Sequence, residues 1–264
     1  MKKADFVEGL AKGLAVLECF DPERQRLNAT LAAQRAGLTR AAARRQLLTL
    51  AHLGYLESDG SHYWLSPKVL RLAGSYLSSA RLPRMVQPAL DRLALASQQA
   101  CSAVVLDGHQ VVIIARSLGP GAARWREGPR GPVAVMAYGL HQGARLPAHA
   151  TSTGRMLLAG LEAPALKAWF AAAPPLARLT AHTRTEPRAL RALIAQARRD
   201  DFCVASEEHE LGVHAVAVPL RERSGRMVAA INVVISPARL QPEALQRELL
   251  PLMRDAVREV QALL

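Results

Sequence analysis

The sequence is poor in cysteine and has no long uncharged run. Its three cysteines, Cys19, Cys101 and Cys203, lie far apart and form no CxxC pair. This pattern excludes a disulfide framework and a cysteine-based zinc site, and it is typical of a reducing compartment. No stretch of about 18 uncharged apolar residues occurs, and the first residues contain no apolar run of signal-peptide length. We therefore expect a cytoplasmic protein that does not cross a membrane.

Aromatic residues are also scarce, at 4% of the chain, although hydrophobic residues make up 50%. A hydrophobic fraction of this size excludes a disordered protein and predicts a core built mainly from aliphatic side chains. The 264 residues are enough for two domains and too many for a single small binding module. No internal repeat or low-complexity tract is present.

Acidic residues are absent between Glu23 and Glu57, a segment that contains six arginines. The whole chain has a formal net charge of +12, and residues 1–85 contain 13 Lys and Arg against 7 Asp and Glu. The N-terminal third is thus more basic per residue than the rest. A positive charge of this kind favours a polyanionic partner, although it does not specify a fold.

Residues 28–67 have the pattern of two helices and a hairpin. Gly37 ends the first helix, whose apolar side contains Leu31, Ala32 and Ala36. Thr39 can cap a second helix over residues 39–53, and one side of that helix is expected to be buried through Ala43, Leu47, Leu50 and Leu53. Arg40 and Arg44 lie toward its other side, with Arg45 adjacent. Two short helices with a cationic second helix are typical of proteins that place a helix in the DNA major groove.

A hairpin is predicted directly after this second helix. Asp59-Gly60 separates the runs Tyr55-Leu56-Glu57 and His62-Tyr63-Trp64-Leu65, and an Asp-Gly pair between such runs favours a tight turn. The hairpin would be the wing of a winged helix-turn-helix. Arginine-bearing helices are also common as solvated surfaces, and this remains the alternative for the arginines by themselves.

The remaining sequence predicts an α+β domain. A helix over residues 6–20 precedes the helix pair, and a helix over residues 67–84 connects to the second domain, with a break at Leu82-Pro83. Further on, we expect helices over residues 85–100, 151–161, 187–200 and 242–264, and strands over residues 102–106, 111–115, 133–138, 202–207, 215–220 and 227–235. Strands in one antiparallel sheet with helices packed around it are expected.

Several segments together resemble the IclR family of bacterial transcriptional regulators. The resemblance lies in GLAKGLAVLECF, LTRAAARRQLLTLAHLGYL, ARLPAHATSTGRMLLAGL, EEHELGVHAVAVPL and GRMVAAINVVI, and covers nearly the full length. The second of these looks most like the subgroup that controls protocatechuate and 4-hydroxybenzoate catabolism. The resemblance implies a winged helix-turn-helix over residues 1–66, a linker helix over 67–84 and a GAF-like effector-binding domain over 85–264. It also implies homodimers or dimers of dimers.

The resemblance assigns candidate residues and partners for DNA binding. The recognition helix would be residues 39–53. The candidate DNA contacts are Thr39, Arg40, Ala41, Arg44 and Arg45 on this helix and His62 in the wing. The expected partners are double-stranded operator DNA, a second copy of the chain and a small-molecule effector, and RNA polymerase is a further candidate. No cofactor or metal is expected.

The family's effector pocket corresponds to the end of the PAHATSTG segment, the strand after EEHELG and the final strand. The candidate effector contacts are Val135, Tyr138, Thr151, Ser152, Thr153, Val213, Ala215, Asn232 and Val234. Relatives that bind small 2-oxo acids have polar groups where this chain has Ala205 and Val234, so an aromatic carboxylate is favoured and a 2-oxo acid is the alternative. Amides at the start of the 151–161 helix could bind a carboxylate. Alternatively, the hydroxyl residues there only cap the helix.

The segment over residues 118–132 is longer than the family pattern has at this point. We interpret it as an inserted surface loop. The alternative is that it covers the mouth of the pocket.

An enzyme or small-molecule carrier with an incidental helix-turn-helix is the alternative from another functional class. His209 and His214 are one residue too far apart for a helical zinc-protease motif, and Gly212 interrupts any helix there. No GxSxG or GxxxxGK[ST] motif occurs. Glu207, Glu208 and His209 have no partnered nucleophile, so we expect structural hydrogen bonds from them rather than acid–base catalysis. The sequence thus predicts a regulator and not an enzyme.

Overall fold

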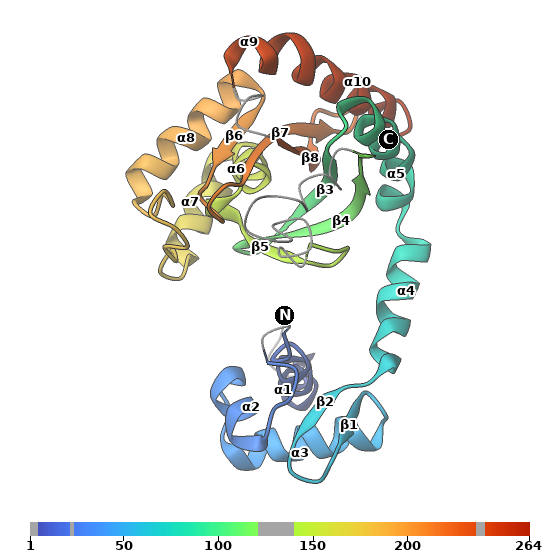
Figure 1. Ribbon diagram of the computed structural model, residues 1–264. Coiled ribbons are helices and arrows are strands. Elements are labelled where there is room, and N and C mark those ends of the chain that lie inside the picture. The colour runs from blue at the N-terminus through green and yellow to red at the C-terminus, as the bar shows by residue number, and fades with distance from the viewer. Residues whose placement is uncertain (1–4, 22–23, 121–139, 236–240) are drawn as a thin grey trace. The chain divides into compact units, whose positions relative to one another are not determined.

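The computed structural model describes residues 5–21, 24–120, 140–235 and 241–264. It divides into two compact units, Met1–Ala80 and Arg81–Leu264 (Figure 1). The first unit is mainly helical with a small hairpin, and the second is a six-stranded sheet covered by helices. The α+β class predicted from the sequence is confirmed. No helix of the described residues combines the length and hydropathy that crossing a membrane requires.

The first unit begins with three helices and a hairpin. The helices are α1 (Glu8–Leu17), α2 (Ala29–Ala36) and α3 (Arg40–His52), and the hairpin pairs β1 (Leu56–Ser58) with β2 (Tyr63–Leu65). Asn28 caps α2 by accepting the amides of Thr30 and Leu31. Gly37 ends α2 with a φ of +64°, the left-handed conformation that glycine adopts without strain. The helix-turn-helix and the hairpin are therefore where the sequence predicted them.

The core of the first unit lies between its three helices. It contains Val16, Ala32, Ala33, Ala43, Leu47, Leu50, Leu56 and Tyr63. Leu53 is not part of it: the prediction that this side chain is buried is wrong, because it is 50% exposed. At 3.6 residues per turn, Leu53 lies about 120° around the helix axis from Leu47, which places it outside the buried face.

A helical segment follows the hairpin and ends the first unit. A 3-10 turn, Pro67–Val69, leads into α4 (Leu70–Ser79), and the side chain of Ser66 caps this turn by accepting the amide of Lys68. The predicted break at Leu82-Pro83 is wrong by a few residues. Helix α4 ends at Ser79, Ala80 is extended, and α5 (Arg81–Ser97) begins directly after it. Pro83 is tolerated there because the amides of a first helical turn have no partner within the helix.

The sheet of the second unit is antiparallel throughout, in the order β5-β4-β3-β8-β7-β6. Its central strands are β3 (Ala100–Asp107), β4 (Gln110–Leu118), β7 (His214–Arg221) and β8 (Met227–Ile235). The edge strands are β5 (Arg145–Pro147) and β6 (Cys203–Ser206). Strands β3, β4, β7 and β8 contain the predicted strands over residues 102–106, 111–115, 215–220 and 227–235.

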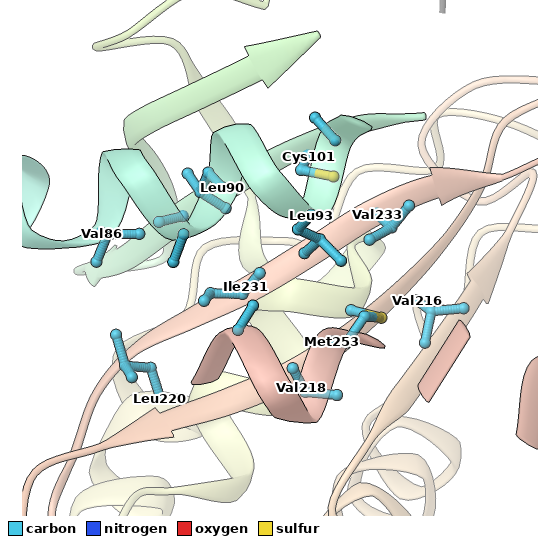
Figure 2. Packing of buried hydrophobic residues seen from close by; sticks show 14 of the residues in the cluster. Val86, Leu90, Leu93, Cys101, Val216, Val218, Leu220, Ile231, Val233 and Met253 are labelled. Atoms are coloured by element: carbon cyan, nitrogen blue, oxygen red, sulfur yellow. The ribbon is translucent and has the colours of Figure 1, made fainter. Parts of the chain in front are cut away.

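Helices cover both faces of this sheet. One face packs on α5 and α10 (Leu250–Gln261), and Figure 2 shows Val86, Leu90 and Leu93 of α5 meeting the strand residues and Met253. The other face packs on α6 (Ser152–Ala159), α7 (Ala163–Ala172) and α8 (Pro187–Asp200) through Met156, Leu158, Trp169, Leu190 and Ile194. Because strand side chains alternate between faces, Ser102 and Val104 lie on the α6 side while Cys101 and Ala103 lie on the α5 side.

Some elements differ from the predicted ones or fall outside the described residues. Strand β5 and helix α7 were not predicted. The expected helix over residues 242–264 is confirmed in outline but consists of α9 (Pro242–Ala244), a π-helical turn (Leu245–Leu249) and α10. The predicted strand over residues 133–138 and residues 121–132 of the predicted inserted loop lie outside the described residues.

Candidate functional site

The exposed side of α3 presents a group of free cations. Arg40, Arg44 and Arg45 are exposed and form no ion pair with a carboxylate in the described part of the chain. Arg35 on α2 differs, since it forms an ion pair with Asp21. Arg40 and Arg44 are four residues apart and therefore lie on the same side of the helix. The helix thus offers several unneutralised guanidinium groups at its N-terminal end, which suits a polyanion.

The start of α3 is held by its cap. Thr39 Oγ1 accepts the backbone amide of Ala42 at 3.2 Å, so the predicted capping role is confirmed. Ala41, the remaining candidate on this helix, is exposed and small. Its small side chain adds little bulk to the exposed surface beside the arginines.

The wing is ordered by its own turn. Asp59 accepts the backbone amides of Ser61 and His62, and these hydrogen bonds lower the pKa of its carboxyl to about 2. His62, the wing candidate, is half-buried, and its Nδ1 lies 2.9 Å from Ser61 Oγ. The guanidinium of Arg26 lies 4.3 Å from the centre of the Trp64 ring on the second strand of the wing. These contacts keep a cation beside the hairpin.

A cavity lies on the α6 side of the sheet in the second unit. Its empty volume is about 680 Å³, part of it open to solvent. Seven of the nine candidate effector residues line it: Thr151, Ser152, Thr153, Val213, Ala215, Asn232 and Val234. The other two, Val135 and Tyr138, lie outside the described residues. The structure thus brings segments far apart in the sequence to one cavity, and their role in binding stays a prediction.

The first turn of α6 forms one wall of the cavity. Thr151 Oγ1 accepts the amide of Gly154 at 3.1 Å, so this threonine is the helix cap. Ser152 and Thr153 are buried. A side chain at Gly154 would place its Cβ 2.1 Å from the carbonyl oxygen of Ala148, so only glycine fits there. This close approach packs the first turn of α6 against the 3-10 turn Ala148–Ala150.

The remaining lining is apolar with a few polar groups. Its apolar members include Ala100, Val104, Ile113, Leu140, Leu146 and Ala205, and the polar ones not predicted from the sequence are Ser102, Arg116, Glu208 and His209. Burial lowers the pKa of His209 and of nearby His149, which favours their neutral forms. An apolar cavity with a small number of polar groups is typical of a small-molecule site.

Arg116 is the cation of this cavity that sequence reasoning missed. Its Nη1 donates to the carbonyl oxygen of Leu140, its Nε is buried without a partner, and burial lowers its pKa. No carboxylate of the described residues forms an ion pair with it. Arg116 is half-buried as a whole, and a half-buried guanidinium without a counter-charge attracts an anionic ligand.

Glu208 also lines the cavity, but its charge is neutralised. The Arg155 guanidinium binds both oxygens of this carboxylate, with Nη1 2.6 Å from Oε1, and Arg155 is only 1% exposed. The amide of Arg184 donates to Glu208 Oε2, and Arg155 Nε donates to the carbonyl oxygen of His149. Glu208 therefore has a structural role, as the sequence predicted. Because the Glu208 charge is paired with Arg155, Arg116 is left as a cation of the described lining without a counter-charge.

Two family models match the chain. The model for the helix-turn-helix domain of IclR matches residues 9–60, and the model for the bacterial transcriptional regulator IclR C-terminal domain matches residues 74–262. Together they span both compact units. The second model alone covers more than half of the chain.

Individual relatives are similar over the full length. The chain is 46% identical over 264 residues to the Pca operon regulatory protein of Acinetobacter baylyi, covering 100% of this chain and 91% of that one. It is 43% identical to the p-hydroxybenzoate hydroxylase transcriptional activator of the same organism, covering 100% and 94%. A solved IclR homologue from Microbacterium hydrocarbonoxydans in complex with 4-hydroxybenzoate is 26% identical with a TM-score of 0.71, covering 96% and 98%.

Proposed function

Because the chain belongs to the IclR family of bacterial transcriptional regulators, we propose that it controls an operon for aromatic-acid catabolism. It binds operator DNA through α3 and the wing, and a small aromatic carboxylate in the cavity beside α6. The family consists of transcriptional regulators, so the chain is not an enzyme. The relatives named for the Pca operon and for p-hydroxybenzoate hydroxylase support this assignment.

The observation that carries the effector assignment is the cavity with one unneutralised guanidinium and mostly apolar walls. Arg116 provides a counter-charge for one carboxylate, and side chains such as Ile113 and Val234 provide surface for a ring. A small 2-oxo acid would satisfy the charge but leave most of the apolar wall without contact. A sugar or an amine would lose either the charge or the apolar contacts. Protocatechuate, 4-hydroxybenzoate or a close catabolite fits both.

A mobility-shift assay on the DNA upstream of the protein's own gene tests the function. We expect the full chain to bind this DNA more tightly than random DNA of equal length at the same salt concentration. Adding 4-hydroxybenzoate or protocatechuate should change the affinity, because a regulator must bind its ligand differently in two states. Equal binding to both DNAs, with no effect of either acid, would contradict the proposal.

Replacement of Arg44 by alanine should weaken operator binding by about 1–3 kcal/mol if this side chain contacts a guanine. Arg40 lies one turn away, and we expect one of the two to reach a base edge while the other contacts phosphate. A phosphate contact would instead weaken binding to all sequences equally and reduce the salt dependence. The measurement is fluorescence anisotropy on operator and random DNA at several salt concentrations.

Arg199→Ala is the matched control for this prediction. Arg199 is an exposed arginine on α8 in the other unit, so the variant loses the same charge away from α3. If Arg40→Ala and Arg44→Ala both bind operator DNA as Arg199→Ala does, α3 is not the recognition helix.

We propose that the chain acts as a homodimer or a dimer of dimers. Phe6, Leu10 and Leu14 lie four residues apart and are 51%, 63% and 50% exposed, which gives α1 and the residues before it an apolar stripe. Helix α4 buries none of its residues and exposes Leu70, Leu72 and Tyr76. Exposed apolar surfaces of this kind are typical of protein interfaces. A symmetric dimer reads two half-sites about one helical turn of DNA apart.

The replacement Leu10→Glu should shift the oligomer toward monomer and weaken operator binding, because it places a charge in the apolar stripe. Light scattering at micromolar concentration measures the change. Leu179→Glu is the control, since Leu179 is an exposed leucine in the second unit. A wild-type chain that is monomeric both with and without DNA would refute the dimer.

A further inference from the structure

A row of polar side chains crosses the floor of the cavity. Arg116 on β4 pairs in register with Ser102 on β3, and Ser102 pairs in register with Asn232 on β8. Directly paired residues of antiparallel strands place their side chains on the same face, so the three form a continuous row. All three line the cavity.

Apolar residues flank this row on both sides. Val104 and Ile113 lie along the strands in one direction, and Ala100, Ala215 and Val234 lie in the other. The floor is therefore a polar stripe between two apolar bands. Such a surface suits a flat apolar group that carries polar substituents at its ends.

The two ends of the row have unsatisfied atoms. Asn232 Oδ1 is buried without a hydrogen-bond partner, and so is Arg116 Nε, within the part of the chain that the structure describes. Buried polar side-chain atoms rarely lack a partner in folded proteins. An acceptor at one end and a cationic donor at the other together define what a ligand must offer: a donor group and an anion.

We propose that Asn232 recognises the ring hydroxyl of the effector while Arg116 holds its carboxylate. This assignment rests on the proposed function and adds the orientation and the specificity of the ligand. The phenolic O–H donates to Asn232 Oδ1, and the carboxylate accepts hydrogen bonds from the guanidinium of Arg116. Neighbouring strands are about 4.8 Å apart, so β4 and β8 are separated by about 10 Å, with the ring between them over Ser102.

A hydroxylated ring is therefore preferred over an unsubstituted one. Benzoate would satisfy Arg116 but leave the buried oxygen of Asn232 without a partner. Sites that hydrogen-bond a ligand hydroxyl discriminate strongly against analogues that lack it, for this reason.

Calorimetric titration of the full chain with 4-hydroxybenzoate and with benzoate tests the assignment. We expect the wild-type chain to bind 4-hydroxybenzoate at least about tenfold more tightly than benzoate, because only 4-hydroxybenzoate has a hydroxyl group that can donate a hydrogen bond to Asn232 Oδ1. In Asn232→Leu, which is similar in size but apolar, the preference should fall to about threefold or less, with benzoate affinity maintained. Asn232→Ala removes the same acceptor with a smaller side chain and should lose the preference equally, which keeps the test valid if the leucine variant folds poorly.

The possible results separate this assignment from the proposed function. If both variants keep the wild-type preference, Asn232 does not recognise the hydroxyl, although the aromatic-acid function stands. If the wild-type chain binds neither acid, both the function and this assignment are wrong. Loss of the preference in both variants, with benzoate still bound, supports the assignment.

Discussion

Replacement of Arg155 by methionine should lower the free energy of unfolding of the second unit by about 3–5 kcal/mol. Arg155 is 1% exposed and binds both oxygens of Glu208 next to the cavity. Removing the cation leaves the buried carboxylate of Glu208 without its counter-charge. Most of the expected destabilisation comes from this unpaired buried charge, and less from the lost attraction between the two groups. The effect should appear as a lower urea midpoint in circular dichroism of the full chain.

Two further variants make this prediction specific. Arg221 forms an ion pair with Asp201 near the surface, so Arg221→Met should cost no more than about 1 kcal/mol. The double variant Arg155→Met/Glu208→Leu removes both charges and should recover much of the stability lost by the single variant. If Arg155→Met is no less stable than Arg221→Met, the buried pair does not support the cavity wall.

Replacement of Arg116 by methionine should weaken binding of 4-hydroxybenzoate by about 1.5–3 kcal/mol, or about 10- to 150-fold, the usual range for a hydrogen bond to a charged group. The Arg116 guanidinium has no carboxylate partner in the described residues, so a ligand carboxylate is its natural counter-ion. Arg145→Met is the control, because Arg145 is an exposed arginine on β5 that pairs with Asp107. Calorimetry on the three proteins gives the comparison.

The first turn of α6 is the competing position for the carboxylate. Ser152→Pro removes one amide donor there, and Thr153→Val removes one hydroxyl. If Arg116→Met binds the acid as the wild-type chain does while Ser152→Pro does not, the carboxylate lies at α6 and not at β4. That result would leave the aromatic-acid function intact but reverse the orientation of the ligand.

Local signals in the sequence were sufficient for the elements that position the DNA-binding residues. Thr39 starts one helix and Gly37 ends another through contacts within a few residues, and the Asp59-Gly60 turn is held by hydrogen bonds from neighbouring amides to the Asp59 side chain. These features do not require knowledge of distant segments. The error at Leu53 arose at the end of a helix. Leu47, Leu50 and Leu53 are spaced by three residues, which is less than one turn of about 3.6 residues, so each successive side chain lies further around the axis from the buried face.

The cavity could be predicted only in part. Residues on α6, β7 and β8 came from the family resemblance, and the structure places them around one cavity. Arg116 was missed for a physical reason. A bulge shifts the pairing of β3 with β4 between Ala103 and Val104, so that Ile113 and Arg116, three residues apart, both line the cavity. In a regular strand they would point to opposite faces, and no feature of the sequence reveals the bulge.

Short or uniformly apolar elements also escaped prediction. Strand β5 has three residues at the edge of the sheet, too few to show an alternating pattern. Helix α7 contains mostly alanine and other apolar residues, of which only Trp169 is fully buried, so no amphipathic period marks it. Their places in the fold depend on packing against β4 and the α6 side of the sheet.

Calorimetric titration of the full chain with a panel of acids tests the central claim most directly. The panel contains 4-hydroxybenzoate, protocatechuate, glyoxylate and pyruvate. We predict that at least one of the two aromatic acids binds directly, without chemical turnover, and that glyoxylate and pyruvate bind much more weakly or not at all. Binding of glyoxylate or pyruvate with no binding of either aromatic acid would contradict the account: the chain would remain an IclR-family regulator, but not one of aromatic-acid catabolism.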